Sequence, residues 1–165
     1  MILFIHVDEP LVLADEPEAL EAVNRVLTER ISSLGCDTAS FLYREETNLS
    51  RTEASLTVSV NHENGYGGLA WFADGNTAKR LMDTKGEEFA DSIWVSMNPT
   101  PPEFDPEILS DPWAPTYIHR ISALPIPTLR AALEEFCKAG TGDRPECVNW
   151  VEGNFNGTLL NPPVE

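Results

Sequence analysis

Apolar residues recur at helical spacing in two parts of the chain, which predicts two amphipathic helices. The first begins at Asp15, a suitable N-cap, and stops at Gly35. Its apolar face consists of Leu20, Val23, Leu27, Ile31 and Leu34. The second runs from about 128 to 139 and is stopped by Gly140. Its apolar face consists of Leu129, Ala132, Leu133, Phe136 and Cys137.

Alternating and short apolar runs predict strands around these helices. The predicted strands cover residues 2–7, 40–44, 55–61, 66–73, 91–97, 116–119 and 146–151. Between the third and fourth, Asn64-Gly65 indicates a two-residue turn, which would pair Glu63 with Tyr66 and Val58 with Trp71. The order of elements predicts an α+β fold, in which two helices pack on one face of a mostly antiparallel sheet.

The length of 165 residues suits a single domain, which we expect to span 1–152. A tail rich in Gly, Asn and Pro follows over 153–165, and we expect it to be flexible. We expect a cytoplasmic protein, because the N-terminal apolar run is too short for a signal peptide and no run could span a membrane. Three cysteines without a C-x-x-C pair predict neither a disulfide framework nor a zinc site, and Cys137 and Cys147 should be core residues.

Charge is the outlying property of the composition. Eleven basic residues stand against 27 acidic ones, so the net charge is −16. Such a surface repels nucleic acid and anionic membranes and attracts basic partners. Solubility alone is the simpler explanation for the same charge.

No sequence motif indicates catalysis, a metal or a cofactor. His6, His62 and His119 lie in or beside separate predicted strands and share no metal-binding spacing. The sequence has no G-x-S-x-G motif, and the glycines at 65–68 lack the lysine of a phosphate-binding loop. The acidic pairs are typical of solvated faces and helix caps. The remaining enzyme hypothesis would need dispersed carboxylates together with His119.

The segment 83–111 combines one-sided charge with aromatic residues, and a proline-rich crossing begins within it. It has one basic residue, Lys85, and aromatic residues at 89, 94 and 104, with Trp113 just beyond. Carboxylates would steer a basic partner and the rings would anchor it. Alternatively, this is a solvated loop whose aromatic residues, including Phe104, Trp113 and Tyr117, point into the core. The candidate partner-binding residues are Asp83, Glu87, Glu88, Asp91, Glu103, Asp105, Glu107, Asp111 and Trp113. A competing acidic patch lies on the first helix, at Asp15, Glu16, Glu18 and Glu21.

Several pieces of the sequence resemble a known family when taken in order. They are Gly68-Leu69-Ala70-Trp71, Ala73-Asp74-Gly75, Ser92-Ile93-Trp94-Val95-Ser96, Leu124-Pro125-Ile126-Pro127 before the second helix, and Arg144-Pro145 followed by Trp150. This pattern resembles immunity family one of bacterial polymorphic toxin systems, which is associated with deaminase toxins. We interpret Arg144-Pro145 and Trp150 as structural, and we expect Trp71, Leu133, Phe136 and Trp150 in the core.

The resemblance implies a protein that binds a cognate toxin, expected to be a nucleic-acid (cytosine) deaminase, and blocks it without chemistry of its own. The toxin must hold a polyanion, so an acidic inhibitor could occupy its basic substrate cleft. The resemblance assigns no binding residue. The alternative is an acidic adaptor, or a mimic of nucleic acid, whose partner is not a toxin.

Overall fold

The fold is α+β, as the sequence predicts, and it is built on one antiparallel sheet. The computed structural model describes residues 2–6, 9–13, 15–30, 37–89 and 92–163, with only the backbone described before Val12. Neighbouring strands run in the order β10-β6-β5-β4-β3-β1-β2, and β9 pairs with β5. Their bounds are β1 Ile2–His6, β2 Glu9–Leu13, β3 Asp37–Tyr43, β4 Ala54–Asn61, β5 Tyr66–Ala73, β6 Trp94–Met97, β9 Leu124–Pro125 and β10 Asn149–Glu152.

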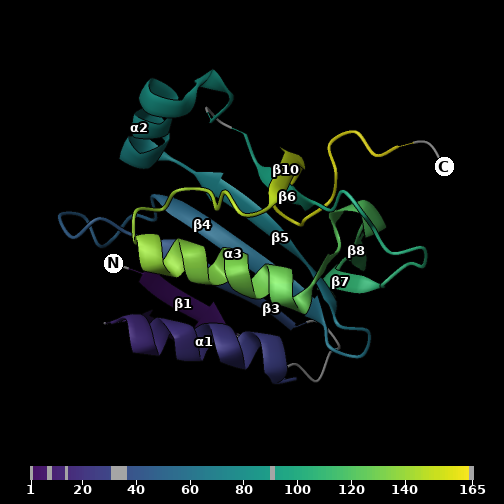
Figure 1. Ribbon diagram of the computed structural model, residues 1–165. Helices are drawn as coiled ribbons and strands as arrows, with labels where there is room; N and C mark the ends of the chain where they lie inside the picture. The colour runs from purple at the N-terminus through teal and green to yellow at the C-terminus, as the bar shows by residue number, and fades with distance from the viewer. Residues whose placement is uncertain (1, 7–8, 14, 31–36, 90–91, 164–165) are drawn as a thin grey trace.

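Helices α1 (Glu16–Thr28) and α3 (Ile126–Ala139) lie side by side on one face of this sheet (Figure 1). Asp15 caps α1 by accepting a hydrogen bond from the Glu18 N–H at 3.0 Å, as predicted. Gly140 ends α3 in the left-handed conformation that favours glycine, with φ of 60°. The first helix is shorter than predicted, because it ends at Thr28; Ile31, Leu34 and Gly35 lie outside the described residues.

The main core fills the space between these two helices and the sheet. Trp71, Leu133 and Phe136 are fully buried there. The Trp71 indole Nε1 also donates a hydrogen bond to the Gly142 carbonyl at 3.1 Å, so its polar atom is satisfied inside the core. Cys137 packs against the same core, whereas Cys147 is exposed and precedes β10, which corrects the expectation that both are core residues.

The hairpin of β4 and β5 has a different register from the one predicted. Asn61 pairs with Tyr66, Val58 with Leu69 and Leu56 with Trp71, so the turn has four residues rather than two. Its geometry comes from Asn61, whose carbonyl accepts from the Gly65 N–H and whose side chain accepts from the Glu63 N–H. A shift of two residues keeps each side chain on its own face of the sheet, which is why the apolar pattern could not reveal it.

A third helix, α2 (Gly75–Lys85), was missed from the sequence. It lies away from α1 and α3, at the end of the molecule where β5 finishes (Figure 1). It has few apolar residues, namely Ala78, Leu81 and Met82, and its only buried residues are Thr77 and Leu81. The short turns η1 (Glu87–Phe89) and η2 (Arg120–Ser122) were missed as well, as was strand β2.

The start of α2 depends on a buried carboxylate from another part of the chain. Glu53, which is 3% exposed, accepts hydrogen bonds from the N–H groups of Asn76 at 2.7 Å and Thr77 at 3.3 Å. A Cβ at residue 75 would lie 2.5 Å from a Glu53 oxygen, so glycine is required at Gly75. Arg51 lies 3.7 Å from the same carboxylate and balances its charge.

Arg144 packs among four aromatic rings beside β10. Its guanidinium carbon lies 4.4 Å from the ring centre of Trp94 and 4.5 Å from that of Phe89, and Trp71 and Trp150 are each 5.9 Å away. Burial lowers the pKa of this guanidinium. Trp150 is half-buried and donates its Nε1 hydrogen to the Pro145 carbonyl at 2.8 Å. These contacts give Arg144, Pro145 and Trp150 a structural role.

Replacing Glu53 by alanine should destabilise the fold by about 2–3 kcal/mol, because two helix N–H groups would lose their acceptor. Urea unfolding measures this loss. Glu46→Ala is the control, since Glu46 is exposed in the same connection between β3 and β4. A loss no larger than that of the control would contradict the role given to Glu53.

Trp150→Ala should cost about 3 kcal/mol, near the lower limit for loss of a large ring because Trp150 is only half-buried. Urea unfolding is again the measurement. Trp113→Ala should leave stability unchanged, because Trp113 is 87% exposed. A Trp150→Ala variant that is fully stable and yet does not bind its partner would place Trp150 at the interface instead.

Candidate protein-binding surface

The structure separates the predicted partner-binding residues into two groups. Asp83, Glu87 and Glu88 belong to α2 and η1, at one end of the molecule. The group from Glu103 to Trp113 belongs to the other end, around the hairpin of β7 (Ile108–Asp111) and β8 (Thr116–Ile118) (Figure 1). Asp91 lies outside the described residues. The segment 83–111 therefore does not form one continuous patch.

The β7–β8 hairpin packs on the face of the sheet that α1 and α3 leave open. Ile108 and Ile118 are its buried residues, and they form a small core with Ala123 and Tyr66. A Cβ at residue 68 would lie 2.7 Å from Ile118 Cδ1, so the hairpin approaches the sheet most closely at Gly68. The glycine cluster noted in the sequence thus serves close packing.

The backbone before the hairpin is pinned to the β4–β5 turn. Asn61 and Asn64 both donate side-chain hydrogen bonds to the Pro106 carbonyl. Asp105 accepts a hydrogen bond from the Glu107 N–H at 2.9 Å, and Glu107 has a φ of 47°, in the left-handed region. A non-glycine residue in this region is strained and is held there by its surroundings. The pinned backbone leaves the side chains of Glu103, Asp105 and Glu107 exposed.

The tip of the hairpin holds Trp113 in the open. Asp111 accepts hydrogen bonds from the N–H groups of Trp113 at 2.9 Å and Ala114 at 3.3 Å, and Pro112 and Pro115 flank the pair. The tip is therefore rigid, while the Trp113 side chain is 87% exposed. An indole on a rigid support loses little entropy on binding, so it is suited to anchoring a partner.

We name this end the acidic–aromatic surface. It consists of Glu103, Phe104, Asp105, Glu107, Asp111, Trp113 and Tyr117. Phe104, Trp113 and Tyr117 are exposed, so the alternative in which these rings point into the core is wrong. The buried residue that anchors the segment is Ile108. Among the described residues, none of its four carboxylates forms an ion pair with lysine or arginine.

Basic residues gather at the opposite end of the molecule. Arg51 pairs with Asp74 at 2.7 Å, Arg80 pairs with Asp143, and Lys85 pairs with Glu146 at 2.7 Å. By contrast, residues 101–119 include four acidic residues and no lysine or arginine. The end that exposes aromatic rings therefore carries four carboxylates and, within residues 101–120, one basic residue, Arg120.

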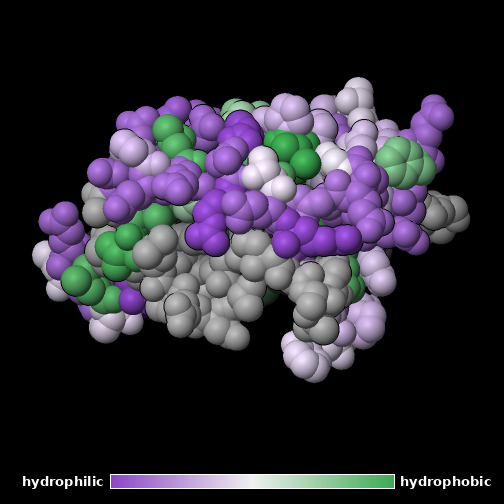
Figure 2. All heavy atoms as spheres, turned by 90° about the horizontal axis from the view of Figure 1, so that it is seen from below, coloured by the Kyte–Doolittle hydropathy of each residue, from purple (hydrophilic) through white to green (hydrophobic). Residues whose placement is uncertain are grey.

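The competing patch on α1 has a different character. Seen from below, the described surface over α1 is mainly hydrophilic (Figure 2). Glu16, Glu18 and Glu21 are exposed, but Arg25 lies on the same helix and pairs with Glu29 at 3.5 Å. Among the described residues of α1, no large apolar side chain is exposed. This face has charges of both signs and no aromatic anchor.

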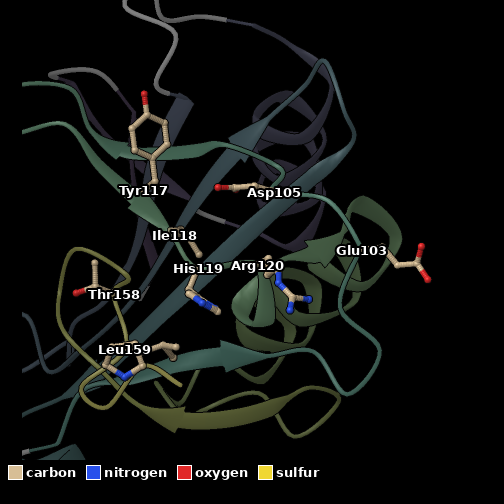
Figure 3. Close-up of a pocket in the computed structure, with 9 residues that line it drawn as sticks. Glu103, Asp105, Tyr117, Ile118, His119, Arg120, Thr158 and Leu159 are labelled. Carbon is tan, nitrogen blue, oxygen red and sulfur yellow. The ribbon is translucent and has the colours of Figure 1, made fainter. Parts of the chain in front are cut away.

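A pocket of about 550 Å³ lies beside the acidic–aromatic surface (Figure 3). Glu103, Asp105 and Tyr117 line one part of it, together with His119, which follows β8, and Arg120, which begins η2. Thr158, Leu159 and Pro162 of the C-terminal segment line another part. The tail, expected to be flexible, thus lines part of this pocket, and it has no periodicity in the sequence that could reveal this role.

The pocket brings His119 near the carboxylates of Glu103 and Asp105. Glu103 and Asp105 are exposed rather than buried, and His119 Nδ1 accepts a hydrogen bond from the Ile121 N–H at 3.3 Å. Within the part of the chain that is described, no three His, Cys, Asp or Glu side chains gather to hold a metal ion. No helix there is long and apolar enough to cross a bilayer. What the surface offers chemically is charge and aromatic area.

Comparison with known proteins identifies the family. The family model described as Immunity protein Imm1 matches residues 8–152. No curated protein and no solved structure matches the chain. Proteins of such a family inhibit toxins and are not enzymes, so their partner is a cognate toxin. Because the match covers most of the chain, this protein belongs to the Imm1 family of immunity proteins.

Proposed function

We propose that this protein inhibits its toxin by placing the acidic–aromatic surface over a basic substrate cleft. The proposed toxin is a nucleic-acid deaminase that acts on cytosine, and the proposed place of inhibition is the cytoplasm. The observation that carries the proposal is the coincidence of four carboxylates without an ion pair among the described residues and three exposed aromatic rings at one rigid end.

Charge supports a toxin that binds nucleic acid. An enzyme that holds a nucleic-acid strand needs a positively charged groove, and it often stacks bases on aromatic rings. The carboxylates of Glu103, Asp105, Glu107 and Asp111 could contact the basic residues that otherwise bind phosphates. The rings of Trp113 and Tyr117 could occupy the space of stacked bases. An inhibitor of this kind competes with the substrate and needs no chemistry.

Rigidity supports a preformed interface. The hydrogen bonds at Asp111 and Pro106, and the prolines around Trp113, fix the backbone before the partner arrives. Binding then orders few further groups, so more of the contact free energy appears as affinity. The four carboxylates of the acidic–aromatic surface also orient the two proteins during their encounter.

Replacing three of the four acidic residues of the acidic–aromatic surface by lysine or asparagine should slow association with the toxin. In the variant Glu103→Lys, Asp105→Asn, Glu107→Lys, the asparagine keeps the acceptor for the Glu107 N–H. We expect an association rate on the order of tenfold or more lower at low salt, and a weaker dependence on salt, because steering acts over a screening length of about 8–10 Å. Stopped-flow mixing at several salt concentrations measures both.

The control carries the same change of charge at the opposite end, as Asp83→Asn, Glu87→Lys, Glu88→Lys. It should slow association much less than the first variant does. Unchanged affinity and rate in a folded first variant would move the contact elsewhere, and the acids of α1 would be the next candidate.

Trp113→Ala should weaken toxin binding by about 2 kcal/mol or more, which is the usual loss at an aromatic anchor. Titration calorimetry with a catalytically inactive toxin measures it. Leu49→Ala is the matched control, because Leu49 is 48% exposed in the β3–β4 connection at the other end. Equal affinities for both variants would remove Trp113 from the interface.

The decisive test of the proposed function is protection against the toxin encoded beside this gene. Co-expression should restore growth, and the purified pair should form a complex from which single-stranded DNA is excluded. Rescue of growth by a complex that still binds and deaminates DNA would contradict inhibition at the substrate cleft. Absence of both rescue and binding would favour the adaptor alternative.

A further inference from the structure

We infer that the C-terminal loop 153–162 is a second part of the toxin-binding surface and helps to determine which toxin is bound. This inference rests on the proposed function. The loop lies beyond the range of the family match, which ends at residue 152. It is therefore an addition to the matched domain rather than part of what the family model describes.

The loop is closed by its own hydrogen bonds. The Asn154 N–H donates to the Thr158 carbonyl at 2.9 Å, and the Gly157 N–H donates to the Asn154 carbonyl at 2.9 Å. The Leu160 N–H donates back to the Glu152 carbonyl at 3.2 Å, and Gly153 forms a β-bridge with Leu159. The loop thus has a defined shape that it can present to a partner.

Side-chain contacts fix the loop to the open face of the sheet. Leu159 is buried and forms a small core with Ala70 and Val95. Phe155 packs edge-on against Phe72, with ring centres 5.0 Å apart. A Cβ at residue 157 would lie 3.1 Å from Ile118 Cδ1, so the loop also touches the β7–β8 hairpin. The loop and the hairpin form one continuous support.

The outer side of this support is unusually apolar. Among the described residues, eight large apolar side chains are exposed, and five belong to the hairpin end or the loop: Phe104, Trp113, Tyr117, Phe155 and Leu160. Exposed apolar side chains in this number, on two segments that touch each other, are typical of a site of protein association. The matched domain contributes the first three residues, and the loop adds the other two.

The pocket joins the two parts and indicates what the loop contacts. It is lined by the apolar residues Ile118, Leu159 and Pro162, and at its rim by Glu103 and Asp105, with Arg120 as its basic residue; Figure 3 shows how most of these side chains lie. These features fit a toxin segment that inserts an apolar side chain into the pocket and sets basic residues against the rim. A toxin without that segment would lose the contact, so the loop would select between toxins.

Leu160→Arg tests the inference, because Leu160 is 54% exposed and its replacement leaves the buried Leu159 in place. We expect binding to the inactive toxin to weaken on the order of tenfold, since a cation would face basic residues across the interface. Pro162→Arg, at the pocket wall, should act in the same direction. Leu49→Arg, with similar exposure at the opposite end, should bind as the unmodified protein does.

The remaining outcomes separate this inference from the proposed function. If Trp113→Ala weakens binding while Leu160→Arg and Pro162→Arg do not, the loop is not in the interface and the inference is wrong, although the proposed surface stands. If Leu49→Arg weakens binding as much as Leu160→Arg, the effect is one of net charge and the inference is again wrong. If none of the variants weakens binding, both fail together.

Discussion

Ile118 packs directly onto the backbone of Gly68, and the candidate binding surface depends on this contact. The contact holds the β7–β8 hairpin against the face of the sheet that the helices do not cover. From there the hairpin carries Trp113 outward, orients the segment that bears Glu103, Asp105 and Glu107, and supports Gly157 of the C-terminal loop. A side chain at residue 68 would displace all of these elements together.

The two faces of the sheet are covered by different kinds of structure. One face carries Leu56, Val58, Leu69 and Trp71 into the main core under α1 and α3, where residues are packed too closely to vary freely. The other face is covered by short, turn-rich segments whose outer sides remain exposed. A family that needs one fold and many toxin specificities could vary these segments without disturbing the core.

The sequence predicted those elements that have a local signal. Asp15 and Gly140 are helix caps of standard types, and the alternation over 55–61 predicted β4. The sequence did not predict α2, because its N-terminus is completed by Glu53, more than twenty residues earlier, and because only Thr77 and Leu81 are buried. The register of β4 and β5 was predicted wrongly, because a shift of two residues leaves the apolar pattern unchanged.

The candidate surface was less predictable than the fold for a physical reason. An irregular segment has no periodicity, so its aromatic residues give no sign of facing inward or outward. Ile108 is buried because the β7–β8 hairpin packs it against the sheet, and Trp113 is exposed because it lies at the tip of the same hairpin. The acidic residues are close together in the sequence, so Asp83, Glu87 and Glu88 were grouped with the acidic residues at 103–111. In the structure, α2 and η1 lie at the opposite end of the molecule from β7 and β8.

If the proposed function is correct, the toxin covers the β7–β8 end of this protein. Hydrogen–deuterium exchange of the protein alone and in complex with inactive toxin tests it most directly, since each segment reports its own protection. Added protection is expected over 103–118 and 153–162, with little change in α1 and α2. Protection confined to α1 or α2 would contradict it.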